Sequence, residues 1–472
     1  MEEDKEAERP LLSSSLTMDD ESFRKDFTGT NLGLIDPQTT ITRLDIFVLL
    51  ISGAMGSGIL CIPFIMMQSG LLLTAGLLVL VAILTWLSVY IAISTSMKLE
   101  IYHLGEICRK LYGQGGRYAV DGMLIFGYFC ALLSYLVTLG TTAASVMTTI
   151  VDPINEAGNV NWLTRPAFNT IILVLTFVLP SSLIKVTGAG VGAGTSMTIA
   201  LIILSKVSFL LILTALTFLI AGSQQQSTFY FTTHARDDLS ELNLYSWTAI
   251  VRSIGVILFA FSFSTNIFPA YCSLPQRGGG GGGIAMYHIS LYSILTCLVL
   301  NFATGVCGYL AFVEETRENI LYNLNSQNEF LSLVNAIKIA VILHLLVYIP
   351  RELLVMKCCI YDSLGWTEGI TDIAHVTLTL CILFQGVCIA LFLEKTTHPF
   401  YKVVSLSGGL SGSMITFVVP GLMGMTTYKA EYNGKRAESF SDLLRFVTGL
   451  ILFLVGITVF LASTYVNVAG LD

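Results

Sequence analysis

Three glycines lie within six residues of an apolar run near the N-terminus, at Gly53, Gly56 and Gly58, and Ser57 and Pro63 accompany them. Glycine favours non-helical conformations and proline cannot donate to the helical hydrogen-bond ladder, so this pattern predicts an interrupted helix. An interruption frees backbone N–H and C=O groups that can bind a charged ligand. The alternative interpretation is close packing between helices through small residues.

A second apolar run carries an interruption of the same kind further along the chain. Ser262, Ser264, Thr265 and Asn266 stand inside it, ahead of Pro269. Irregular backbone in an apolar segment is tolerated where it lines a cavity. We therefore expect the two interruptions to form one polar binding site.

The elements that must position this site are membrane-spanning helices. Asp, Glu, Lys and Arg make up 12% of the chain, against about 25% in soluble domains. Residues 71–97 and 123–150 contain none of them, and each run exceeds the ~20 residues that span a bilayer. Hydropathy predicts an all-α polytopic membrane protein with eleven spans, at 44–67, 71–96, 118–150, 167–185, 196–222, 245–273, 285–313, 331–357, 372–394, 401–427 and 441–465.

The distribution of charge predicts how the chain lies in the membrane. Most of the 25 Lys and Arg residues, Arg351 included, fall in segments that would share a side with the N-terminus, which indicates a cytoplasmic N-terminus. Residues 1–43 are polar and acidic and are expected to be a disordered cytoplasmic tail. Residues 44–465 form the transporter-like domain. Interruptions in spans one and six are typical of an inverted repeat of five plus five helices, at about 44–222 and 245–427, with an extra helix at 441–465.

Five segments in order over roughly residues 44–325 carry the patterns of one known family. They are Gly56-Ser57-Gly58-Ile59-Leu60 with Pro63; Tyr102, Leu104 and 113–117; 179–185 up to Ser196; 259–271; and 308–312 with Asn319-Ile320-Leu321. At these residues the chain resembles the amino acid/auxin permease family of the amino acid–polyamine–organocation superfamily.

The resemblance implies a LeuT-like fold and an amino-acid substrate held at the unwound parts of helices one and six. The substrate carboxylate would bind the backbone at Gly56, Ser57 and Gly58, where unpaired N–H groups concentrate. Its ammonium group would bind carbonyls near Ser52, Ala260 and Phe261. The other residues expected at this site are Ser262 and Phe263, and either phenylalanine is a candidate wall or gate, with lipid-facing packing as the alternative.

The coupling ion is predicted from departures from the family pattern. Sodium-coupled members carry Asn in the first helix and Thr or Ser in the eighth, whereas this chain has Ser52 at the first position and no Ser or Thr in 335–351. Lys206 in span five is expected to replace the sodium charge, the alternative being a lysine that snorkels to the surface. His344 in span eight is a candidate proton carrier, the alternative being a buried structural histidine.

These patterns favour a secondary transporter that carries neutral amino acids with protons by alternating access, in the plasma membrane or a vacuolar or lysosomal membrane. Two alternatives remain open: an amino-acid sensor or receptor with little net transport, and a sodium-coupled amino-acid symporter. No enzyme motif, metal-ligand cluster or cofactor-binding pattern is present in the sequence, and no basic stripe indicates a nucleic-acid partner.

Overall fold

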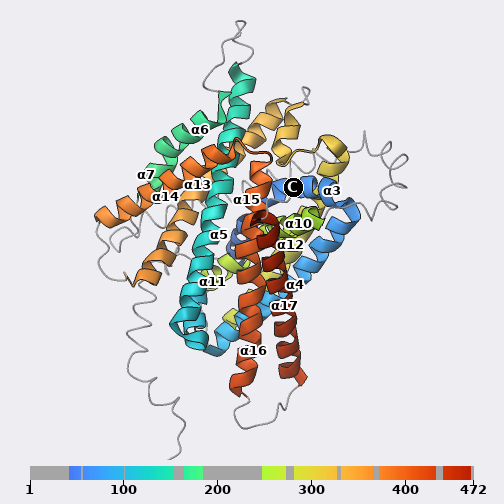
Figure 1. Cartoon of the computed structure of the whole chain (residues 1–472), viewed down its shortest axis with the longest axis vertical. Coiled ribbons are helices and arrows are strands. Elements are labelled where there is room, and N and C mark those ends of the chain that lie inside the picture. Colours follow the sequence, from blue (N-terminus) through green and yellow to red (C-terminus); the bar gives the residue numbers. More distant parts are fainter. Residues whose placement is uncertain are drawn as a thin grey trace, which may run out of the picture.

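The computed structural model describes residues 42–54, 57–99, 101, 103–151, 164–183, 247–272, 281–326, 331–365, 372–431 and 440–468. These residues form helices and short connections (Figure 1). Eight of the helices are long and apolar enough to cross a membrane, and Ser57–Ser69 and Pro166–Ser182 are shorter apolar helices. The predicted span 196–222 and nearly all of the predicted tail lie outside the described residues.

The first span is interrupted where the glycines predict it. Helix α2 (Arg43–Ala54) ends before the described chain resumes as a 3-10 turn, η1 (Ser57–Cys61), which leads into α3 (Ile62–Ser69). Pro63 stands in the first turn of α3, where its missing N–H costs no helical hydrogen bond.

The sixth span is interrupted in the same way. Helix α10 (Trp247–Ala260) ends before residues 261–263, and α11 (Ser264–Cys272) begins after them. The N–H of Phe263 bonds to the carbonyl of Phe261 at 2.7 Å, a turn tighter than a helix allows. Both predicted helix breaks are therefore confirmed.

The remaining helices surround these two interrupted ones. Their bounds are α4 (Leu71–Leu99), α5 (Leu104–Val151), α6 (Pro166–Leu173), η3 (Val174–Val178), α7 (Leu179–Ser182), α12 (Gly281–Phe312), η5 (Val313–Glu315), η6 (Ile320–Ser326), α13 (Leu331–Leu364), α14 (Asp372–Leu393), α15 (Pro399–Ser407), η8 (Gly408–Gly412), η9 (Met414–Val418), α16 (Val419–Glu431) and α17 (Phe440–Val468). The helical run of α5 changes direction at Gly113, whose φ is 74°.

Two groups of helices can be traced in Figure 1. In one, α12 packs against α2, α3 and α4, and in the other α5 packs against α6, α13 and α14. Helix α15 contacts both α10 and α5, and its continuation η8 also packs on α10. This places α15 and η8 between the two groups, beside the break in the sixth span.

The connection after α12 fixes the start of α15. A Glu318 carboxylate oxygen accepts a hydrogen bond from the N–H of Tyr401 at 2.9 Å. This bond satisfies an N–H group at the helix N-terminus that has no acceptor within the helix. Burial raises the pKa of this carboxyl from 4.5 to about 7, although its bonds to the N–H groups of Tyr401 and Phe400 and the charge of Lys402 act in the opposite direction.

A pH dependence of stability follows from Glu318. Because its pKa in the folded protein, about 7, lies above the ordinary 4.5, the folded protein holds a proton that the unfolded chain releases. The protonated carboxyl contributes about 3 kcal/mol at most to the free energy of unfolding. This contribution is present at acidic pH and is lost as the pH rises to neutrality. We expect the melting temperature of the detergent-solubilised protein to fall less over this window in Glu318→Gln than in the wild type. The exposed Glu315 gives the control Glu315→Gln, and equal slopes in all three proteins would contradict the assignment.

Candidate functional site

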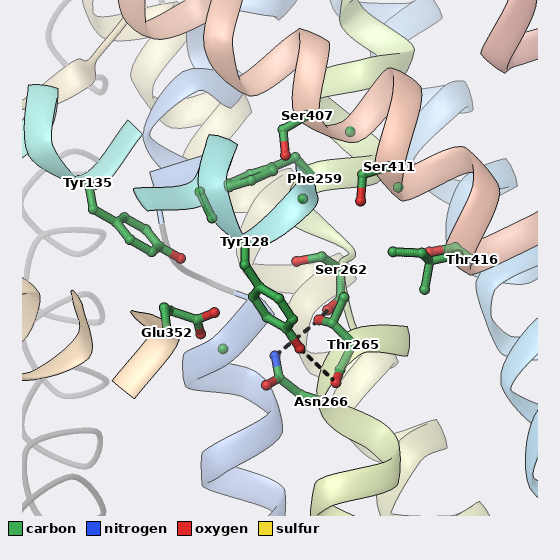
Figure 2. A pocket seen from close by; sticks show the side chains of 16 residues that line it. Tyr128, Tyr135, Phe259, Ser262, Thr265, Asn266, Glu352, Ser407, Ser411 and Thr416 are labelled. Carbon is green, nitrogen blue, oxygen red and sulfur yellow. Dashed lines mark hydrogen bonds between the residues drawn. The ribbon is translucent and has the colours of Figure 1, made fainter. Parts of the chain in front are cut away.

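A cavity of about 50 Å³ lies where both interrupted helices, α5, α13 and η8 meet (Figure 2). At ~10–15 Å³ for one water, this volume holds a few water molecules. Its lining is a mixture of small, hydroxyl and aromatic residues with one carboxylate: Gly53, Gly127, Tyr128, Ala131, Tyr135, Phe259, Ser262, Thr265, Asn266, Glu352, Ser407, Gly408, Ser411, Gly412, Ile415 and Thr416.

The two helix breaks touch each other next to this cavity. A Cβ atom added at Gly58 would lie 2.9 Å from the Ala260 Cα and 3.0 Å from the Ala260 nitrogen, closer than real Cβ contacts. The absence of a side chain at Gly58 therefore allows the backbone of the first break to contact the backbone of the second. A Cβ at Gly53 would likewise lie 2.8 Å from the Asn266 Nδ2 and 3.1 Å from the Tyr348 Oη, so Gly53 allows α2 to approach α11 and α13.

A buried charged pair on α13 borders the cavity. Arg351 and Glu352 are 3% and 4% exposed, and the Arg351 Nη1 donates to the Glu352 Oε1 at 3.2 Å. The same nitrogen donates to the Tyr348 Oη at 3.1 Å, and Nη2 donates to the Asn266 Oδ1 at 3.2 Å. The guanidinium thus joins α13 to α11 just beyond the sixth-span break, while the Glu352 carboxylate faces the cavity (Figure 2).

Aromatic rings surround this charged pair. The Arg351 guanidinium carbon lies 5.3 Å from the centroid of the Tyr348 ring, within the range of a cation–π contact. Tyr135 of α5 packs edge-on against Tyr348 at 5.6 Å between ring centroids, and the His344 ring stacks on the Tyr348 ring at 5.2 Å. The rings cover the Arg351 side of the pair and hold α5 against α13.

Of the residues expected to bind substrate, Ser262 lines the cavity. The Ser57 hydroxyl is instead within 2.8 Å of the Ser134 hydroxyl on α5, and Gly58 contacts Ala260. Phe261 and Phe263 are fully buried, with ring centroids 6.3 Å apart, and neither lines the cavity. Gly56 lies outside the described residues, and Ser52 is described only as part of α2.

The two predicted ion-coupling residues have different outcomes. Lys206 lies outside the described residues. His344 lies on α13 and stacks on Tyr348, and it is not among the residues that line the cavity. The structure therefore does not test the coupling role of either residue.

The residues of α13 and η8 at the cavity are not among those that the sequence predicts. The charge distribution places Arg351 at the cytoplasmic end of the eighth span, which is wrong: in the structure α13 continues to Leu364 and Arg351 is buried. An adjacent pair of opposite charges in an apolar run was the available signal. Small residues such as Gly408, Ser411 and Gly412 carry no comparable signal.

Known structures share this arrangement of helices. MhsT in complex with L-phenylalanine aligns over 89% of this chain and 98% of its own with a TM-score of 0.53 at 16% identity. A manganese transporter of Eremococcus coleocola aligns over 91% of this chain and 88% of its own, with a TM-score of 0.54 at 12% identity. At these identities the likeness establishes the fold alone.

Sequence relatives indicate the same class. The Sodium-coupled neutral amino acid symporter 2 of Danio rerio is 21% identical over 410 residues, which cover 84% of this chain and 78% of the relative. The fold defines an all-helical polytopic membrane protein that resembles these known structures. Residues 39–462 match the family described as transmembrane amino acid transporter protein, and the chain belongs to that family. The resemblance to the amino acid/auxin permeases is thereby confirmed.

Proposed function

We propose that this protein is a secondary active transporter of neutral amino acids, coupled to protons, that works by alternating access. The observation that carries the proposal is the contact of two interrupted helices, Gly58 against Ala260, beside a polar cavity. Half-helix ends of this kind bind the charged groups of a zwitterion. The Danio rerio relative is a symporter of neutral amino acids by name, and a neutral substrate agrees with a cavity lined mainly by hydroxyls and aromatic rings.

Substrate binding is proposed at the two breaks. The substrate carboxylate binds N–H groups of the first break, at Gly56, Ser57 and Gly58, and the ammonium group binds carbonyls at the break after Ala260. The hydroxyl of Ser262 lies at the cavity wall, where it contacts the substrate. Outward and inward opening then alternate as the group of helices around α2 and α12 moves against the group around α5 and α13.

Proton coupling is proposed because the hard oxygen ligands that sodium prefers are sparse on the eighth span. Residues 335–351 contain no Ser or Thr, and the buried positive charge between α13 and α11 is the Arg351 guanidinium. Sodium coupling is the second candidate, since the Danio rerio relative carries sodium coupling in its name. The N-terminus is proposed to face the cytoplasm, with the protein in the plasma membrane or in a vacuolar or lysosomal membrane.

The test is uptake of a panel of labelled amino acids into proteoliposomes, with proton and sodium gradients imposed separately. We expect accumulation of neutral amino acids under the inward proton gradient, with acidic and basic amino acids excluded. Accumulation under the sodium gradient alone would support the second candidate. Saturable binding without accumulation under either gradient would contradict transport and favour a sensor.

A further inference from the structure

Glu352 is the single charged residue among the sixteen residues that line the cavity in the described part of the chain (Figure 2). It projects from α13, across the cavity from the hydroxyl groups of α11 and η8, and is 4% exposed. A carboxylate buried inside a membrane-spanning helix is costly, and such residues mark ion pathways and proton relays. Its position at the cavity wall means that a ligand or water in the cavity can reach it.

The partner of Glu352 holds a fixed charge. A guanidinium does not deprotonate in proteins, so within the pair of Arg351 and Glu352 the carboxylate is the member whose charge can change. Arg351 is also not dedicated to the carboxylate, because it donates to the Tyr348 hydroxyl and the Asn266 amide oxygen as well. Loss of the negative charge therefore leaves the guanidinium hydrogen-bonded and in place.

Few other titratable groups face Glu352. From α13 these are Arg351 and Tyr348, whose hydroxyl accepts a hydrogen bond from the same Arg351 nitrogen that donates to the carboxylate. Helix α5 contributes the cavity-lining Tyr128 and Tyr135, and Cys359 of α13 lies near Tyr128. The described lining residues from α2, α10, α11, α15, η8, η9 and the break between α10 and α11 have no titratable side chain. The charge of the cavity is therefore set by Glu352 and its neighbour Arg351.

Two opposing influences act on a carboxylate in this place. Burial favours its neutral form, whereas an adjacent cation favours its ionised form. When Glu352 is ionised the pair is neutral, and when it takes a proton the cavity gains a net positive charge. That charge favours entry of a substrate carboxylate, so proton and substrate each raise the affinity for the other by linkage.

We propose that the Glu352 carboxylate carries the coupling proton of the transport cycle. It takes a proton from water on the proton-rich side, forming the neutral acid, and returns it to water on the other side after the substrate leaves. Arg351 acts as the fixed counter-charge that ties this event to α11 through Asn266. The inference rests on the proposed transport function and gives it a coupling residue.

The test compares wild type, Glu352→Gln and Glu352→Asp in proteoliposomes. Two assays are run: accumulation of a neutral amino acid under an imposed proton gradient, and exchange of that amino acid at equal internal and external pH. A gradient of one pH unit supports up to about tenfold accumulation for one proton per substrate. We expect Glu352→Gln, a mimic of the protonated form, to lose this accumulation, retain exchange, and bind substrate with an affinity that no longer varies with pH.

Glu352→Asp keeps a titratable carboxylate on a shorter side chain, so it should retain accumulation with a displaced pH profile. The control is Glu394→Gln, at a half-buried position just beyond the end of α14, which should behave as wild type. Accumulation by Glu352→Gln at the wild-type level would overturn the proposal. If Glu352→Gln does not fold, a Glu352→Asp pH profile identical to that of the wild type would overturn it instead.

Assays of the wild type distinguish failure of the proposed transport function from failure of the proton-carrying role of Glu352. Wild-type protein that accumulates no amino acid under any gradient would contradict the proposed function itself. Wild-type protein that accumulates amino acids under a sodium gradient and is indifferent to protons would leave amino-acid transport standing and overturn the role of Glu352.

Discussion

Substitution of Gly58 by alanine is expected to abolish amino-acid uptake. The new Cβ would lie 2.9 Å from the Ala260 Cα, and because that Cα belongs to the backbone at the end of α10, it cannot move aside without displacing the helix. Overpacking of this kind costs ~1–3 kcal/mol, and a penalty of ~2 kcal/mol on the arrangement in which the two breaks touch lowers its population about 30-fold. The measurement is initial uptake in proteoliposomes, normalised to the amount of folded protein in the membrane.

Gly76 provides the matched control for Gly58. It is exposed on α4, and a Cβ there would meet no atom within 4 Å. Gly76→Ala should leave uptake unchanged and stabilise the helix by up to ~1 kcal/mol. Wild-type uptake by Gly58→Ala would show that contact between the two breaks is not required for transport.

Substitution of Arg351 by methionine is expected to have the largest effect on stability. Its guanidinium donates hydrogen bonds to Glu352, Tyr348 and Asn266, and its removal leaves the Glu352 carboxylate buried without its cation. Breaking a buried ion pair from one side costs ~3–5 kcal/mol. We expect a large fall in the melting temperature of the detergent-solubilised protein at neutral pH.

The double variant Arg351→Met/Glu352→Gln removes both charges and should recover much of the lost stability, since the main penalty is the unpaired carboxylate. Arg109→Met is the control, because the Arg109 side chain is 40% exposed in its pair with Glu106 and such surface pairs contribute ~0–1 kcal/mol. A double variant less stable than Arg351→Met alone would contradict this account of the pair.

The helix breaks could be predicted because their signals are local. Gly53, Gly58 and Pro63 act on the backbone at their own positions, and Ser262 with its neighbours places polar groups where an unbroken apolar helix would exclude them. In the structure Gly53 and Pro63 lie in the helices that flank the first interruption, Gly58 lies in the 3-10 turn η1, and Ser262 lies in the second interruption. Short-range sequence features were therefore sufficient to predict where the helices end.

The cavity could not be predicted to the same extent because its walls come from helices far apart in the sequence. Tyr128 of α5, Glu352 of α13 and Ser411 of η8 meet only after packing. Glu352 was missed for a further reason: charges near the end of an apolar run were interpreted as the membrane boundary, whereas α13 extends beyond them. Phe261 and Phe263 were expected at the cavity and are instead buried beside it.

The most direct test of substrate binding in this cavity is protection of an engineered cysteine at its wall. Ser262→Cys is treated with a small hydrophilic thiol reagent, with and without neutral amino acid, and modification is measured at that position by mass spectrometry, so that the ten native cysteines do not interfere. Thr397→Cys, at an exposed position ahead of α15, serves as the control. We expect neutral amino acids to slow modification of Cys at position 262 at concentrations that saturate uptake, and to leave position 397 unaffected. Equal rates at position 262 with and without a transported amino acid would contradict substrate binding between the two interrupted helices.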